Sequence, residues 1–120
     1  MNSFSGLISL HELHVSSNLL TMLPPYVFTA LENLTMLDLS TNQIAHISGT
    51  SFHGLHSLKY LELRGNCLNQ IDGNLLNSLS YLEKLDISQN PYSVQSVSAN
   101  FLSKHSGLLL MRVMHSDICC

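Results

Sequence analysis

Four ionisable residues recur at one constant interval along the chain, and three of them are carboxylates. They are His14, Asp38, Glu62 and Asp86, and their numbers differ by the same 24-residue step (38 − 14, 62 − 38, 86 − 62). Each stands between two apolar residues, which predicts a short strand with alternate side chains on opposite faces. If the strands pair in register, the carboxylates stack about 5 Å apart. Such a row would attract a basic ligand, although solvated aspartates on an exposed strand are an alternative interpretation.

The neighbours of Glu62 add side chains suited to protein recognition. Tyr60 and Arg64 lie two residues before and two residues after it, and tyrosine and arginine often dominate binding energies at interfaces. Lys84 follows Tyr60 at the same 24-residue interval. The predicted ligand-binding residues are His14, Asp38, Tyr60, Glu62, Arg64, Lys84 and Asp86.

The remaining reactive side chains form no recognisable catalytic or metal-binding pattern. His11 and His14 lie three apart in a predicted strand, so they point to opposite faces. The sequence contains no C-x-x-C or H-E-x-x-H motif. It also contains no Ser/His/Asp arrangement and no glycine-rich phosphate loop. We therefore expect no enzyme activity, no metal site and no cofactor.

The elements that would position the candidate residues come from an internal repeat. Residues 58–68 read L-x-x-L-x-L-x-x-N-x-L, the leucine-rich-repeat signature. The asparagine recurs at the same 24-residue interval, and apolar columns align with it. The predicted fold is an α/β leucine-rich-repeat solenoid that is curved. One parallel sheet forms its concave face, and short helical or irregular turns form its convex face.

The recurring asparagines have a predicted structural role rather than a ligand-binding one. Where the chain leaves each strand, backbone N–H and C=O groups are buried without a strand partner. A carboxamide can both donate and accept a hydrogen bond there, so each asparagine can join its neighbouring turn. The predicted ladder consists of Asn18, Asn42, Asn66 and Asn90.

The repeat pattern also sets the expected organisation of the chain. Residues 1–92 are predicted to contain four 24-residue repeats. Residues 93–120 are predicted to form a degenerate fifth repeat and the start of a C-terminal cap or hinge. Leu109 and Met111 fall at strand positions of that fifth repeat, whereas Met114 stands where asparagine is expected.

Composition agrees with a solenoid that buries leucines between neighbouring repeats. The 120 residues are 45% hydrophobic and 11% charged, with a net charge of −3. This is too apolar for a disordered chain and disfavours a nucleic-acid binder. The first residues resemble no secretory signal and already fit the repeat from Phe4, so we interpret the chain as a piece of a longer protein. No membrane contact by this segment is expected, because its longest apolar run is far too short to span a bilayer.

Two further features concern the compartment in which the protein folds. Asn33, followed by leucine and threonine, forms an N-glycosylation sequon that would place the chain in the secretory pathway. Cys67 is predicted to be a free thiol. Cys119 and Cys120 are adjacent and rarely could bond to each other, so they are predicted to pair with partners beyond the last residue.

Residues 4–92 resemble the 24-residue repeat class of extracellular animal receptors and matrix proteins. The usual cysteine-rich C-terminal flank of that class is not matched, because no cysteine follows Asn90-Pro91-Tyr92 until Cys119. The tail, residues 109–120, which ends H-S-D-I-C-C, is similar to the junction before the first membrane helix in relaxin-receptor-like G-protein-coupled receptors.

These resemblances imply a cell-surface receptor whose ectodomain binds a protein or peptide ligand, and the acidic row favours a basic one. They also imply a tether to a membrane domain beyond Cys120. The low charge of the chain predicts no nucleic-acid partner. The alternatives are an extracellular matrix or adhesion module and an intracellular leucine-rich-repeat scaffold.

Overall fold

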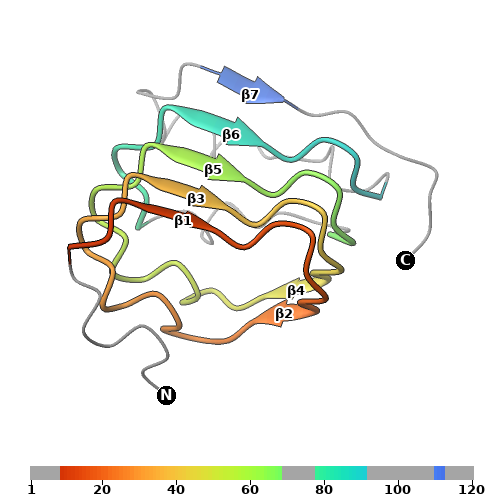
Figure 1. Ribbon diagram of the computed structural model, residues 1–120, viewed down its shortest axis with the longest axis horizontal. Helices are drawn as coiled ribbons and strands as arrows, with labels where there is room; N and C mark the ends of the chain where they lie inside the picture. Colours follow the sequence, from red (N-terminus) through yellow and green to blue (C-terminus); the bar gives the residue numbers. More distant parts are fainter. Residues whose placement is uncertain (1–8, 69–77, 92–109, 113–120) are drawn as a thin grey trace.

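A computed structural model describes residues 9–68 and 78–91 with their side chains, and residues 110–112 by their backbone. Strands β1 (Glu12–His14), β3 (Met36–Asp38), β5 (Tyr60–Glu62), β6 (Lys84–Asp86) and β7 (Leu110–Arg112) form one parallel sheet in that order. Figure 1 shows these strands stacked in chain order, one per repeat. The parallel sheet predicted from the period-two pattern is therefore confirmed.

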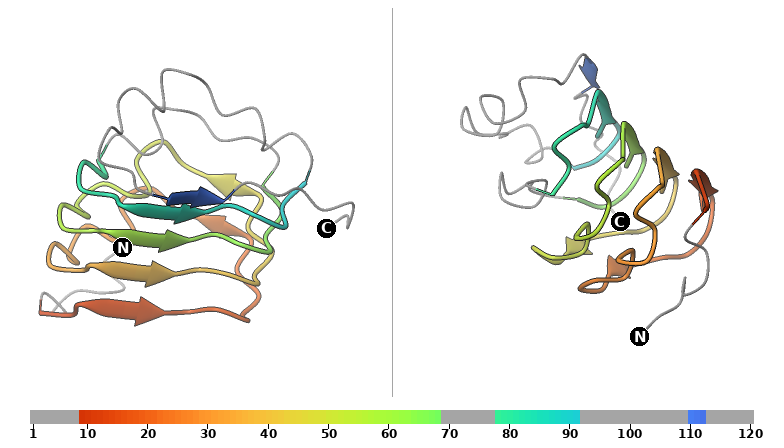
Figure 2. Two further views of the ribbon diagram at one scale, coloured as in Figure 1. Left: turned by 90° about the horizontal axis from the view of Figure 1, so that it is seen from above. Right: turned by 90° about the vertical axis from the view of Figure 1, so that its left-hand side faces the viewer.

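The sheet lies on the inner side of a curved solenoid. In Figure 2 the strands follow an arc, and the rest of each repeat lies on its outer side. There, β2 (Met22–Leu23) and β4 (His46–Ile47) pair as a second, two-stranded parallel sheet, which the sequence analysis did not anticipate. We call the solvent-facing side of the five-stranded sheet the concave face.

The convex side is built from single turns in the part of the chain that the structure describes. The N–H of Leu31 donates to the carbonyl of Phe28 at 2.9 Å, and the N–H of Leu34 donates to the carbonyl of Leu31 at 3.1 Å. These bonds link residues three apart, but the turns do not continue into a helix. Of the two predicted alternatives, helical or irregular turns, the described repeats use the second.

Leucines from successive repeats fill the space between the two sides. The side chains of Leu37, Leu61 and Leu85, in the middle of β3, β5 and β6, are at most 1% exposed. Phe28 and Phe52 stack on the convex side with ring centroids 6.3 Å apart. Burying such a side chain contributes about 1.5–3 kcal/mol, so the repeats hold each other in register and fix the outward residues between the leucines.

Two kinds of backbone position carry conformations that the sequence pattern does not reveal. Ser17, Thr41, Gly65 and Gln89, each just before a ladder asparagine, have φ angles of 57°, 55°, 70° and 58°. Only one of the four is glycine, although this region of backbone space favours glycine. Gly54 has a φ of 99°, and a Cβ added there would lie 2.7 Å from the backbone of Thr29.

The last described strand departs from the 24-residue interval. Met111 of β7 pairs in register with Leu85 of β6, whereas the constant interval would place Leu109 there. Met111 therefore lies in a strand as predicted, but two residues later than the constant interval gives for the partner of Leu85, and Leu109 lies outside the described residues.

Candidate functional site

The predicted acidic row is present on the concave face. Asp38 pairs in register with Glu62, and Glu62 pairs with Asp86. All three side chains are partly buried, and strands of one sheet lie about 4.8 Å apart. The sheet therefore brings together three carboxylates that come from three different repeats.

The two aspartates of the row are already engaged by serines of their own repeats. Asp38 Oδ1 accepts hydrogen bonds from the Ser40 N–H at 3.0 Å and from the Ser40 hydroxyl at 2.6 Å. Asp86 Oδ1 accepts the same two bonds from Ser88, the N–H bond measuring 2.9 Å. These contacts close the turn that leaves each strand, so both aspartates serve the fold of their own repeat.

Glu62 occupies the same position in the central repeat without such a contact, because Arg64 stands where the other repeats have serine. Among the described residues, no N–H or hydroxyl donates to the Glu62 carboxylate. Its partial burial, and after that the negative charges of Asp38 and Asp86, raise the pKa of Glu62. A cation placed here would offset the repulsion from the two aspartates and favour the ionised carboxylate.

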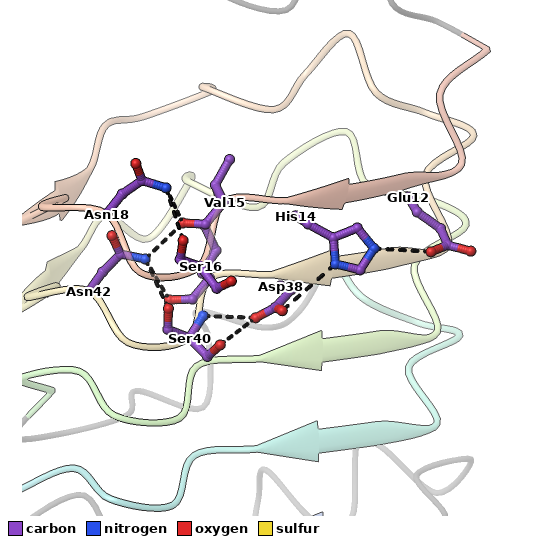
Figure 3. A network of polar contacts seen from close by, with 9 residues as sticks. Glu12, His14, Val15, Ser16, Asn18, Asp38, Ser40 and Asn42 are labelled. Carbon is purple, nitrogen blue, oxygen red and sulfur yellow. Dashed lines mark hydrogen bonds and ion pairs between the residues drawn. The ribbon is translucent and has the colours of Figure 1, made fainter.

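His14 contacts carboxylates at the first-repeat end of the row. Its Nε2 lies 3.1 Å from Glu12 Oε1 and its Nδ1 lies 3.7 Å from Asp38 Oδ2, as Figure 3 shows. The hydrogen bond with Glu12, and then the contact with Asp38, raise the pKa of His14. Although burial alone would raise the pKa of Asp38, the Ser40 and His14 contacts lower it. His14 thus contacts two carboxylates of the concave face, those of Glu12 and Asp38.

Tyr60 and Lys84 lie beside the row and contact each other. The Lys84 ammonium lies 5.5 Å from the centroid of the Tyr60 ring, a favourable cation–π geometry. Neither Lys84 nor Arg64 forms an ion pair with a carboxylate within the described residues. The two cations therefore leave the charge of Glu62 uncompensated at short range.

Two open depressions flank the row. One, of about 440 Å³, lies on the side of Met36, Tyr60 and Lys84. The other, of about 490 Å³, has polar walls that include Ser40, Arg64 and Gln89. Glu62 and Asp86 line both depressions, so the carboxylates form the ridge between them.

The sheet also extends the row of charged positions by one residue that was not among the predicted ligand-binding residues. Asp86 pairs in register with Arg112 of β7, so the row of charged positions continues with a basic residue. The expected 24-residue interval hid this position, because the fifth strand is displaced by two positions. The acidic stretch therefore runs from Asp38 to Asp86 and does not extend to the next strand.

The ladder asparagines lie below this surface, at the exit of each strand. Asn42 Nδ2 donates to the carbonyl of Val15 at 3.1 Å, and Asn42 Oδ1 accepts the N–H of Leu20 at 3.2 Å. Asn66 and Asn90 make the corresponding bonds to the repeat before each of them. Asn18 is exposed, and in the described structure it bonds only within its own turn.

Other predicted features lie away from the concave face. Asn33 is exposed in the turn before β3, and Thr35 of its sequon donates its hydroxyl to the carbonyl of His11 at 3.0 Å. Cys67 is 7% exposed and disulfide-bonded, so its interpretation as a free thiol is wrong. The predicted pairing of Cys119 and Cys120 lies outside the described residues.

Within the described ranges, no group of three or more histidine, cysteine or acidic side chains could hold a metal ion. No helix in these ranges is long and apolar enough to cross a bilayer. Both findings concern residues 9–68, 78–91 and 110–112.

Comparisons with known proteins identify both the repeat and its architecture. A family profile described as leucine rich repeat matches residues 8–68 and 33–91. The solved structure of the Drosophila Toll–Spatzle complex contains a similar chain, with a TM-score of 0.82 and 21% identity over 93% of this chain. The TLR13–ssRNA13 complex gives a TM-score of 0.82 and 26% identity over 92% of this chain. No curated protein matches the sequence.

The chain spans only 15% and 16% of the length of the matched Toll and TLR13 chains. At 21% identity the likeness to Toll shows the fold alone. It confirms the predicted solenoid with its parallel sheet.

Proposed function

The chain belongs to the leucine rich repeat family, and we propose that it is a ligand-recognition segment of a cell-surface receptor ectodomain. In this proposal the ligand is a protein or peptide, and its basic surface docks on the concave face at Asp38, Glu62 and Asp86. Tyr60, Arg64 and Lys84 supply the surrounding contacts.

The state of Glu62 is the observation that carries the proposal. Its neighbours Asp38 and Asp86 are held by serines, whereas the described residues give Glu62 no hydrogen-bond donor. It is partly buried between two like charges, at the centre of the sheet. A carboxylate in this position gains more from an incoming cation than a fully solvated one does.

The similarity to the Toll and TLR13 chains supports the proposal of a receptor ectodomain. The Toll chain was solved in a complex with Spatzle, and this chain has the same fold over most of its length. The TLR13 structure instead contains single-stranded RNA. The acidic row argues against an RNA ligand here, because nucleic-acid binding relies on basic side chains that neutralise phosphates. We therefore favour a protein ligand.

Binding suits the geometry of the concave face better than catalysis does. The two depressions beside the carboxylates are open to solvent, whereas enzymes usually enclose the reacting atoms in a deep pocket. The proposed function is accordingly recognition without chemistry.

The mode of membrane attachment is a separate part of the proposal. We include a cell-surface location in the proposal for two reasons. A receptor ectodomain lies outside the cell, and Asn33 presents an exposed N-glycosylation sequon. The link to G-protein-coupled receptors rests on the tail resemblance at residues 109–120, of which the structure describes only the backbone of residues 110–112. A membrane domain beyond Cys120 would supply the tether.

A photo-crosslinking experiment tests the ligand-binding face. The chain is fused to an antibody Fc region and screened against a panel of purified secreted proteins. A photoreactive benzoylphenylalanine then replaces Tyr60 on the concave face or, as a matched control, the 53% exposed Tyr26 on the convex side. Crosslinking of a bound protein through position 60 and not through position 26 is expected. Crosslinking through position 26 alone would overturn the proposal.

A further inference from the structure

The central repeat differs from its neighbours at two positions on one surface. Where the second and fourth repeats have aspartate and serine, the third has Glu62 and Arg64. In the other two repeats the serine hydroxyl donates to the aspartate. In the central repeat that internal contact is replaced by two opposite charges.

These two charges do not neutralise each other. The ion pairs among the described side chains all involve His14, and neither Glu62 nor Arg64 has a salt-bridge partner within the described residues. Both side chains line the polar depression, together with Ser40, Thr41 and Gln89. Glu62 is partly buried and Arg64 is exposed, so each keeps an unpaired charge on the same open surface.

The spacing of the two charges is set by the backbone. Glu62 is the last residue of β5, and the next residue still follows the sheet, because the N–H of Leu63 donates to the carbonyl of Asp86 at 2.8 Å. Two residues of extended chain cover about 7 Å. An extended ligand segment has the same repeat distance between residues i and i+2, whose side chains point to one face.

We propose that Glu62 and Arg64 form a two-charge subsite for an extended ligand segment that carries a basic and an acidic side chain two residues apart. The basic side chain bonds to the Glu62 carboxylate, and the acidic side chain bonds to the Arg64 guanidinium. This subsite rests on the proposed function of the concave face and narrows its ligand to a segment of mixed charge. Tyr60 and Met36, in the other depression, can cover the apolar stem of the basic side chain.

The subsite would select a different ligand from the one that a purely acidic surface would select. An acidic row prefers the ligand with the most positive charge. The Glu62–Arg64 pair instead prefers one charge of each sign, because a second cation would lie against Arg64. Complementary charge patterns of this kind set register and exclude wrong partners more than they add affinity.

Four designed β-hairpin peptides test the proposal with the full chain. The first presents Arg and Glu on one face at positions i and i+2, and the second presents them at i and i+1 on opposite faces. The third and fourth carry Arg/Arg and Glu/Glu at i and i+2. Titration calorimetry at low salt measures each affinity. The first hairpin is expected to bind about threefold to fivefold more tightly than the others, as two exposed ion pairs allow.

Substitutions in the chain separate the subsite from general charge effects. Glu62→Arg should move the preference to the Glu/Glu hairpin. Glu32→Arg and Lys59→Glu, at exposed positions away from the pair, should leave the preference unchanged. Thermal melts check that each variant is folded.

If the Arg/Arg hairpin binds at least as tightly as the mixed one, the two-charge subsite is overturned while a basic ligand remains supported. Equal binding of all four hairpins to the native chain and to Glu62→Arg would overturn both the subsite and the proposed ligand face.

Discussion

The side-chain oxygen of Asn66 accepts a hydrogen bond from the backbone N–H of Ile44 at 3.1 Å. Its Nδ2 donates to the carbonyl of Leu39 in the same earlier repeat at 3.0 Å. One buried carboxamide thus satisfies the backbone of two repeats at the point where the strand ladder stops. The concave face depends on such joints, since they hold successive strands in register.

Replacing Asn66 with alanine should therefore destabilise the fold by roughly 1–3 kcal/mol, because it leaves buried backbone groups without partners. Asn18→Ala is the matched control: Asn18 is exposed, and its described bonds stay within its own turn. Thermal and denaturant melts of both variants measure the difference. Equal losses for the two variants would contradict the role of the ladder between repeats.

Gly54 should tolerate no side chain. Its φ of 99° disfavours any L-residue, and a Cβ would lie 2.7 Å from Thr29 Cα. Gly54→Ala should lower the free energy of unfolding by about 1–3 kcal/mol. Gly49→Ala is the control, because nothing lies within 4 Å of a Cβ added there. Denaturant melts compare the two, and a near-native midpoint for Gly54→Ala would show that the Thr29 turn moves aside.

The exposed sequon at Asn33 predicts a glycan when the chain is produced through the secretory pathway of animal cells. Glycosidase treatment should shift the band on a gel, and Asn33→Gln should abolish the shift. A protein recovered from the cytosol with reduced cysteines would contradict the extracellular part of the proposal.

Ligand binding should depend on pH through Glu62. Partial burial, and then Asp38 and Asp86, raise the pKa of Glu62, so its carboxylate takes up a proton at a higher pH than an ordinary glutamate. A bound cation requires the deprotonated form. Affinity for a basic ligand should thus fall as pH drops through the raised pKa and should be constant above it.

The raised pKa of Glu62 affects folding stability in the direction opposite to its effect on ligand binding. Since the folded state binds this proton more tightly than the unfolded state, Glu62 favours the fold at low pH and loses that contribution as pH rises through the raised pKa. Titration calorimetry and melts across this range, with Glu62→Gln as control, measure both effects. A native pH profile identical to that of Glu62→Gln would exclude Glu62 as the titrating group.

The sequence predicts the sheet and its acidic row because both follow from side-chain alternation at a constant interval. Asp38 and Glu62 stack because Leu37 and Leu61 are buried, which leaves the residue after each leucine facing out. The sequence also shows that serine follows each aspartate by two residues and that Arg64 breaks this pattern, but the hydrogen bonds from the serines to the aspartates were found only in the structure.

Other features depend on contacts that no local pattern encodes. The positive φ at Thr41 is not marked by its residue type, because the repeat geometry forces a β-branched residue into a region that glycine prefers. The disulfide bond of Cys67 is not marked by its local sequence. The displacement that places Arg112 beside Asp86 arises from a longer final repeat. Each of these requires the assembled solenoid.

The kinetics of ligand binding to Glu62→Lys test the concave face most directly. Association and dissociation rates are measured for the native chain and for Glu62→Lys at two salt concentrations, using the protein ligand found in the Fc screen, with Glu32→Lys as control. If the acidic row attracts the ligand, Glu62→Lys slows association and reduces its salt dependence, since charges at an interface act mainly on the association rate. Unchanged rates and an unchanged salt dependence for Glu62→Lys would show that the row is a solvated surface and not the ligand-binding site.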